Sequence, residues 1–339
     1  MSRHNDRHKY EDLVLKGFRL PESKIEAFEM RLQKKPTDWR ARFQLLGYYS
    51  QKQHADKAVA KKLVAIGVWL IDNMPDCGVI EHWVFIDEKI HPALHAELKQ
   101  HWLAQLDVNK DNLRVIGSAA AYFGLQDTGL AEELYNRAIM LEPTASEWSQ
   151  ELAWLLRRQG PERALDALNA IRGAIGKESD PRRIYYMLDD LAELAFNAGN
   201  LDEASEAALK CLSLAFSFGK DWNDGNAIHN SNEILGRIAL KKGDIEAAKK
   251  HLSLAGDTPG SPQLNSFGPD LKLAEELFAV GAVECVVGYL EACKKFWSTG
   301  CERGALERGI GQIRRGEIPN FAHKFADYKC DGGQDCDHE

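Results

Sequence analysis

The last ten residues contain side chains that typically bind metal ions. Cys330, Cys336 and His338 are zinc-type ligands, and the aspartates between them add oxygen donors. Structural zinc sites usually pair two cysteines a few residues apart, and this tail has no such pair. We therefore interpret residues 330–339 as a flexible tail without a metal, and keep a zinc site at these three residues as the less favoured alternative.

Two other segments match known ligand-binding loops only in part. In IRGAIGKES, Ile171 stands where a phosphate loop needs its first glycine, and Glu178 replaces the hydroxyl residue. The segment DWNDGNAIHNSN begins like a calcium loop at Asp221, but Asn232 occupies the position that needs a bidentate glutamate. No serine-hydrolase elbow, metalloprotease helix or dinucleotide-binding glycine set is present. We predict a protein without enzymatic activity and without a cofactor.

The composition excludes several further classes. The 339 residues carry a net charge of −8, which disfavours nucleic-acid binding, and 44% are hydrophobic, enough for a substantial core. The N-terminal segment MSRHNDRHKYEDLV is too polar for a secretory signal, and no 18-residue apolar run could span a membrane. The seven cysteines are odd in number, which fits reduced side chains. These features predict a cytoplasmic protein that binds neither membranes nor nucleic acid.

A helical pattern recurs along the chain and must position any functional side chains. In residues 234–255, ILGRIALKKGDIEAAKKHLSLA, apolar or small residues recur at helical spacing on both sides of a glycine turn. Small residues in the second helix would allow two antiparallel helices to approach closely. Equivalent alanines stand at Ala131, Ala164, Ala204 and Ala248, which are 33, 40 and 44 residues apart.

This pattern resembles the tetratricopeptide repeat, an antiparallel helix pair of about 34 residues. The segments LLGYY and KKFW also resemble parts of uncharacterised bacterial proteins with this repeat, although that likeness implies no mechanism. The resemblance implies an all-α fold, a right-handed α-solenoid of antiparallel helix pairs with degenerate repeats at both ends.

The repeat spacing predicts four regions. Residues 1–108 would form an N-terminal helical region with degenerate repeats, one of them over 79–106 with Trp83, Ile86, Trp102 and Leu103 in its core. Residues 109–256 would hold four clear repeats, and 257–329 a degenerate repeat with a capping helix, followed by the tail.

Three long turns separate the repeats. We interpret the Gly/Pro/Ser-rich stretch after residue 255 as a turn, with Gly256 capping one helix and Pro269 in the first turn of the next. The turns at 176–181 and 217–226 are interpreted as spacers, with partner contact as the alternative.

In the resembled family, the first helix of each pair lines a concave groove. Chaperone-binding members hold a peptide's terminal carboxylate with lysines and asparagines, and the equivalent positions here lack that cationic set. The predicted binding residues are instead acidic and then mixed: Asp189, Asp190, Glu193, Asn197, Glu233, Arg237 and Lys241. A ligand with a basic residue would fit the acidic part. The alternative is that Glu233 and Arg237 form an ordinary surface ion pair.

Two functions follow from this pattern. The favoured one is a non-enzymatic scaffold that binds a protein or peptide in the groove of the solenoid. The alternative is a small-molecule-regulated sensor or an enzyme built within a helical cage, which a closed apolar pocket with buried charged groups would favour. The pattern indicates neither the partner's identity nor an oligomeric state.

Overall fold

The computed structural model describes residues 3–52, 57–297, 301–321 and 324–325, and within them every regular element is a helix. The chain is divided into two compact units, residues 1–155 and 156–339. This boundary lies inside the range 109–256 that the repeat spacing groups together. The candidate zinc ligands Cys330, Cys336 and His338 lie outside the described residues.

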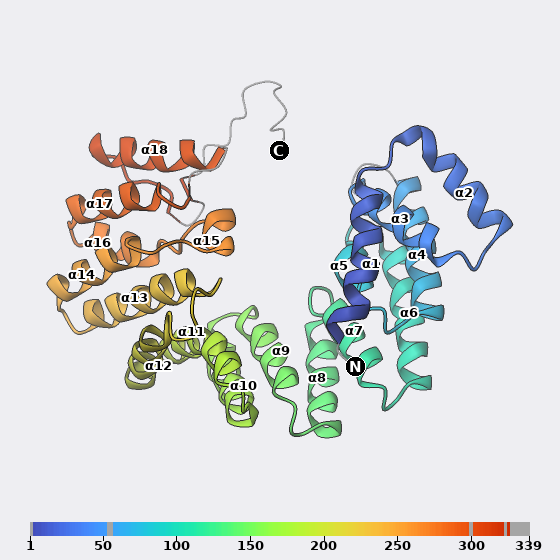
Figure 1. Cartoon of the computed structure of the whole chain (residues 1–339), viewed down its shortest axis with the longest axis horizontal. Helices are drawn as coiled ribbons and strands as arrows, with labels where there is room; N and C mark the ends of the chain where they lie inside the picture. Colours follow the sequence, from blue (N-terminus) through green and yellow to red (C-terminus); the bar gives the residue numbers. More distant parts are fainter. Residues whose placement is uncertain (1–2, 53–56, 298–300, 322–323, 326–339) are drawn as a thin grey trace. The chain divides into compact units, whose positions relative to one another are not determined.

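The first unit consists of successive helices joined by short turns (Figure 1). They are α1 (Arg3–Phe18), α2 (Ile25–Lys34), α3 (Trp39–Ser50), α4 (Lys57–Asn73), α5 (Ile80–Trp83), α6 (Pro92–Val108), α7 (Leu113–Phe123), α8 (Thr128–Leu141) and most of α9 (Ser146–Arg157), whose last two residues belong to the second unit. Helices α1 and α3 touch through their backbones, because a Cβ atom on Gly47 would lie 2.0 Å from the carbonyl oxygen of Val14. Glycine at this repeat position is therefore a requirement of packing.

The degenerate repeat predicted over 79–106 is only partly regular. Its first helix, α5, is a single turn, whereas α6 is long and carries a buried face. Ile86 and Trp102 are buried as predicted, but Leu103 is exposed, so its assignment to the core was wrong. The buried face of α6 follows the four-residue spacing of Leu98 and Trp102, and Leu103 falls beside it.

The second unit continues with α10 (Ala164–Lys177), α11 (Pro181–Asn197), α12 (Leu201–Leu214), α13 (Asp224–Lys241), α14 (Ile245–Gly256), α15 (Pro262–Phe267), α16 (Lys272–Ala279), α17 (Val283–Cys293) and α18 (Cys301–Arg314). The pairs α11–α12, α13–α14 and α16–α17 each pack together, and the first helices α11, α13 and α16 contact one another in that order (Figure 1). The second unit therefore places side chains of consecutive first helices side by side.

Local sequence explains these pairs. Gly199 and Gly243 follow the first helices with φ of 79°, a left-handed conformation that favours glycine. Asn200 and Asp244 then accept hydrogen bonds from backbone N–H groups at the start of the second helices. Ala204 is fully buried where α12 packs against its neighbours.

The Gly/Pro/Ser-rich stretch is more than a turn. Gly256 is the last residue of α14 rather than a left-handed cap, and Pro269 precedes α16, so both assignments were wrong. Pro262 starts the additional short helix α15. Thr258 Oγ1 donates to the carbonyl oxygen of Gly225 at 2.9 Å, which fixes the stretch to α13.

We predict that Ala204→Leu destabilises the second unit. The added side chain would overpack a closed helix–helix contact, which typically costs about 1–3 kcal/mol. Urea unfolding should show a lower midpoint for this variant, while the control Ala279→Leu, at an exposed position of α16, should unfold like the wild type. Equal midpoints for the two variants would contradict the packing argument.

Candidate functional site

Most of the predicted binding residues meet at one cavity of about 180 Å³ in the second unit. The cavity is lined by Arg157, Asp189, Asp190, Glu193, Asn230, Glu233, Ile234, Arg237, Asp270 and Lys272. Two predicted residues do not line it. Asn197 and Lys241 are exposed, and the Lys241 ammonium lies 5.3 Å from the centre of the Phe196 ring.

Arg157 neutralises two of the predicted acidic residues. Its Nη1 donates to Asp190 Oδ1 at 3.0 Å, and its Nη2 lies 2.6 Å from Glu193 Oε2. The sequence analysis missed Arg157, although a signal existed, because 33 residues separate it from Asp190. One repeat period places two side chains at equivalent positions of neighbouring first helices.

Asp189 is the acidic residue of α11 in the cavity that has no cationic partner among the described residues. Asn230 Nδ2 donates to its Oδ2 at 3.2 Å, and the backbone N–H of Asp190 donates to its Oδ1 at 3.0 Å. No cation of the described residues lies within ion-pair distance of this carboxylate. Burial, followed by repulsion from Asp190, raises the pKa of Asp189 to about 7.

Glu233 is almost completely buried, with 3% of its surface exposed. Its Oε1 accepts a hydrogen bond of 2.6 Å from the backbone N–H of Leu273, at the start of α16, and its Oε2 has no hydrogen-bond partner. Burial, followed by the charge of Asp270, raises the pKa of Glu233 well above its usual value. The carboxyl group is thus held in place by one oxygen and left unsatisfied at the other.

The surface ion pair between Glu233 and Arg237, the alternative interpretation of these two residues, does not form. Arg237 pairs instead with Glu276 of α16, at 2.9 Å, and its guanidinium stacks over the Phe196 ring at 4.4 Å. Glu233 therefore lines the cavity without a salt bridge to a described residue.

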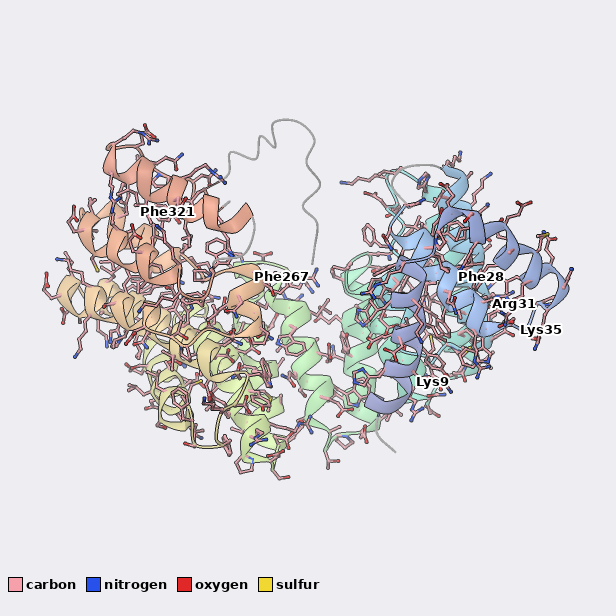
Figure 2. The ribbon with its side chains drawn as sticks, turned by 45° about the horizontal axis from the view of Figure 1, so that its top comes forward. Lys9, Phe28, Arg31, Lys35, Phe267 and Phe321 are labelled. Atoms are coloured by element: carbon pink, nitrogen blue, oxygen red, sulfur yellow. The ribbon has the colours of Figure 1, made fainter. Side chains whose placement is uncertain are left out.

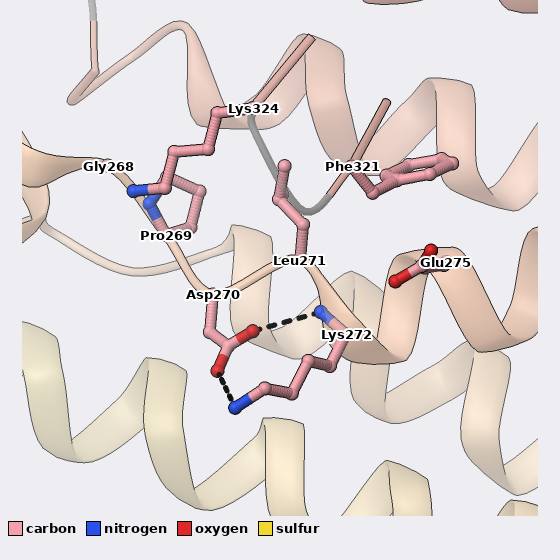
Figure 3. Close-up of a pocket in the computed structure, with 8 residues that line it drawn as sticks. All are labelled: Gly268, Pro269, Asp270, Leu271, Lys272, Glu275, Phe321 and Lys324. Carbon is pink, nitrogen blue, oxygen red and sulfur yellow. Dashed lines mark hydrogen bonds and ion pairs between the residues drawn. The ribbon is translucent and has the colours of Figure 1, made fainter. Parts of the chain in front are cut away.

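The segment between α15 and α16 contributes Asp270 to the wall of the cavity, and α16 contributes its first residue, Lys272. Asp270 Oδ2 and Lys272 Nζ form an ion pair of 3.0 Å, and Asp270 Oδ1 also accepts a hydrogen bond from the Lys272 backbone N–H (Figure 3). The same two residues line a second cavity of about 520 Å³, whose wall includes Pro269, Leu271 and Phe321. Sequence periodicity could not locate Asp270 and Lys272, because they belong to a segment outside the repeat pattern.

The charges of the first cavity are unevenly satisfied. Arg157, Arg237 and Lys272 each have a carboxylate partner, whereas Asp189 and Glu233 have no cationic partner among the described residues. An arrangement of this kind can accept a cationic group with hydrogen-bond donors. In the parts of the chain that the structure describes, no three metal-type side chains come close enough to hold a metal ion.

Comparisons with known proteins find similar structures but no related sequence family. No family model and no curated protein matches the sequence. The structure is similar to that of PilW, titled a widely conserved type IV pilus biogenesis factor, with 13% identity and a TM-score of 0.42 over 75% of this chain and all of that one. It is also similar to pilF of Pseudomonas aeruginosa, with 14% identity and a TM-score of 0.41 over 73% of this chain and 98% of that one.

A third similar structure is the Cut9–Hcn1 hetero-tetramer of the APC/C, with 13% identity and a TM-score of 0.41 over 94% of this chain and 63% of that one. None of these similarities carries an argument about function. The fold class follows from the chain's own elements, which over the described residues form an all-α array of packed helix pairs. Over the described residues, no helix is both long and apolar enough to cross a membrane.

We predict that Asp189 makes stability fall as the pH rises from about 4 to above 7. Its native pKa of about 7 exceeds the unfolded value of about 3.9, so in this range the native state holds a proton that the unfolded state has lost. Asp189→Asn removes this linkage. Urea unfolding at pH 5, 6, 7 and 8 should therefore show a weaker pH dependence for the variant than for the wild type.

The matched control is Asp202→Asn, at an exposed position of α12, whose pH dependence should follow that of the wild type. Parallel curves for the wild type and Asp189→Asn would show that this carboxyl group is not perturbed by burial.

Proposed function

We propose that the chain is a non-enzymatic scaffold that binds a protein or peptide partner on the first helices α11 and α13. In this proposal, a basic side chain of the partner enters the cavity of about 180 Å³. One observation carries the proposal: Asp189 and Glu233, from two neighbouring helices, line the same cavity without a cationic partner among the described residues. A guanidinium or ammonium group supplies the missing positive charge.

The size of the cavity supports a side chain rather than a larger free ligand. Pockets for small molecules usually enclose about 300–1,000 Å³, and this cavity is smaller. Its lining is polar and mostly charged, whereas the sensor alternative predicts a closed apolar pocket. The buried Glu233 is the one feature that fits that alternative.

The site is also prepared for binding. Arg157 is fixed by two carboxylates, Arg237 by Glu276 and the Phe196 ring, and Asp189 by two hydrogen bonds. Little side-chain freedom then remains to be lost when a ligand enters, which lowers the cost of association.

We predict that the cavity distinguishes arginine from its neutral isostere. Isothermal titration calorimetry would compare the capped peptide Gly-Arg-Gly with Gly-citrulline-Gly, and the arginine peptide should bind at least about tenfold more tightly. Asp189→Asn should lower the affinity for the arginine peptide by a similar factor, because a hydrogen bond to a charged group contributes about 1.5–3 kcal/mol. Asp202→Asn is again the control.

Two outcomes would count against the proposal. Equal affinities for arginine and citrulline would show that charge is not recognised, and an unchanged affinity in a folded Asp189→Asn variant would place the site elsewhere. Tighter binding of free agmatine than of the peptide would favour the sensor alternative.

We predict further that affinity for the arginine peptide rises from pH 5.5 to pH 8. Asp189 has a pKa of about 7, so it is mostly protonated at the lower pH and mostly ionised at the higher one. Only the ionised form attracts a cation. The Asp189→Asn variant should show a weaker pH dependence in the same titrations and keep the part due to Glu233, whose pKa is also raised, whereas an identical dependence in both proteins would show that Asp189 does not contribute.

A further inference from the structure

The connection between α12 and α13 is a rigid structure built around one buried carboxylate. Asp224 Oδ1 accepts hydrogen bonds from Tyr185 Oη at 3.0 Å and from the backbone N–H of Phe216 at 3.2 Å, while its Oδ2 accepts one from the backbone N–H of Asp221 at 2.9 Å. Asp224 is 3% exposed. These bonds fix the path of the connection, which argues against a mere spacer.

Asp221, the first residue of the partial calcium-loop pattern, also accepts hydrogen bonds that fix this connection. Its Oδ1 accepts from the backbone N–H of Asn223 at 3.0 Å, and its Oδ2 accepts from Tyr186 Oη at 2.7 Å. Both oxygens are therefore engaged in holding the connection against α11.

This rigid connection presents an aromatic surface to solvent. The Trp222 ring packs on the Tyr186 ring with 5.2 Å between centroids, yet 49% of Trp222 remains exposed. Phe216 is exposed as well and has a φ of 66°, a left-handed conformation that is costly for a residue other than glycine. We call Trp222 and Tyr186 the aromatic shelf.

The aromatic shelf lies on the same face of α11 as the acidic cavity. Tyr186 precedes Asp189 by three residues and Asp190 by four, and residues at these spacings share a helix face. All three are partly exposed, whereas Met187 and Leu188 between them are buried. Three residues of helix correspond to about 4.5 Å, or one to two residues of an extended peptide.

Local charge indicates which side chain would suit the shelf. Arg182, one turn before Tyr186 on the same face, has a side chain that is 48% exposed, and its Nη2 donates to the carbonyl oxygen of Phe218 at 3.1 Å. Its Nε also lies 3.9 Å from Asp221 Oδ2, so the carboxylate at the shelf is already paired and offers nothing to a second basic residue of a ligand. An apolar or aromatic side chain would instead cover the exposed ring of Trp222, and tryptophan is among the residues that contribute most to binding at interfaces.

We propose that the partner carries an apolar or aromatic residue one or two positions from its basic residue, and that this side chain packs on the aromatic shelf. The inference rests on the proposed function, since the basic residue in the cavity fixes the register. It adds a second recognition point, which neither the charge of the cavity nor the repeat pattern supplies.

Capped peptides containing Arg-Gly-Gly, Arg-Phe-Gly, Arg-Gly-Phe, Phe-Arg-Gly, Phe-Gly-Arg and Arg-Lys-Gly would test the inference by calorimetry with the full chain. At least one phenylalanine peptide should bind the wild type fivefold or more tightly than Arg-Gly-Gly, and Arg-Lys-Gly should show no such gain. Trp222→Ala should remove the gain and leave Arg-Gly-Gly unchanged.

The matched control is Phe267→Ala, which removes a 72% exposed aromatic side chain from α15 (Figure 2) and should keep the gain. Thermal melting would confirm that both variants are folded. Binding of Arg-Gly-Gly without any gain from phenylalanine would overturn the aromatic shelf alone, as would a gain that survives Trp222→Ala or an equal gain from lysine. If no peptide binds the wild type, the proposed function fails with it.

Discussion

A close contact between Gly225 and Gly260 determines where the wall of the cavity lies in the second unit. A Cβ atom on Gly225 of α13 would lie 1.9 Å from the carbonyl oxygen of Gly260, so only glycine lets the segment after α14 reach the helix. Ser261 Oγ then donates to Asn226 Oδ1 at 2.5 Å. The segment continues to Leu273, whose backbone N–H holds Glu233. A larger residue at position 225 would displace the turn after α14 and, with it, the wall of the cavity.

Ion pairs around the cavity determine which carboxylates remain without a cationic partner. The acidic stripe of α11 looks uniform in sequence, but Arg157 satisfies Asp190 and Glu193 and leaves Asp189. On α13, Arg237 is drawn away to Glu276, which leaves Glu233 without a salt bridge to a described residue. The distinction between satisfied and unsatisfied carboxylates depends on neighbouring helices, so it exists only in the folded unit.

The sequence predicted the features that repeat and failed on those that interrupt the repeat. The spacing of small residues such as Ala204 and Ala248 predicted antiparallel helix pairs, and α12 and α14 confirm them. The same spacing placed Asp189 and Glu233 on adjacent first helices. The spacing could not predict the burial of Glu233. The segment near Asp270 that covers it has no helical periodicity, so its position beside α13 could not be predicted from the sequence.

The connections α14–α16 and α12–α13 depart from the repeat pattern, and they contribute side chains that the repeat does not supply. One brings Asp270 and Lys272 to the cavity, and the other brings Trp222 to the exposed face of α11. Both are fixed by buried hydrogen bonds, through Thr258 in one case and between Tyr185 and Asp224 in the other. Insertions held in this way add side chains to the face formed by the first helices without disturbing the helix packing, because they dock on first helices and leave the second helices free to pack.

Two carboxyl groups of the cavity without a cationic partner among the described residues support the proposed ligand. A buried carboxyl group without a full set of partners costs stability, and an apolar side chain at the same place of a helical repeat would avoid that cost. Glu233 carries this cost at its Oε2, and Asp189 adds a carboxyl group that accepts two hydrogen bonds but has no cationic partner among the described residues. Titratable groups shifted by burial and gathered in a cavity are more typical of functional sites than of structural ones. A bound cation would pair with both groups and thereby offset the cost that the free protein carries.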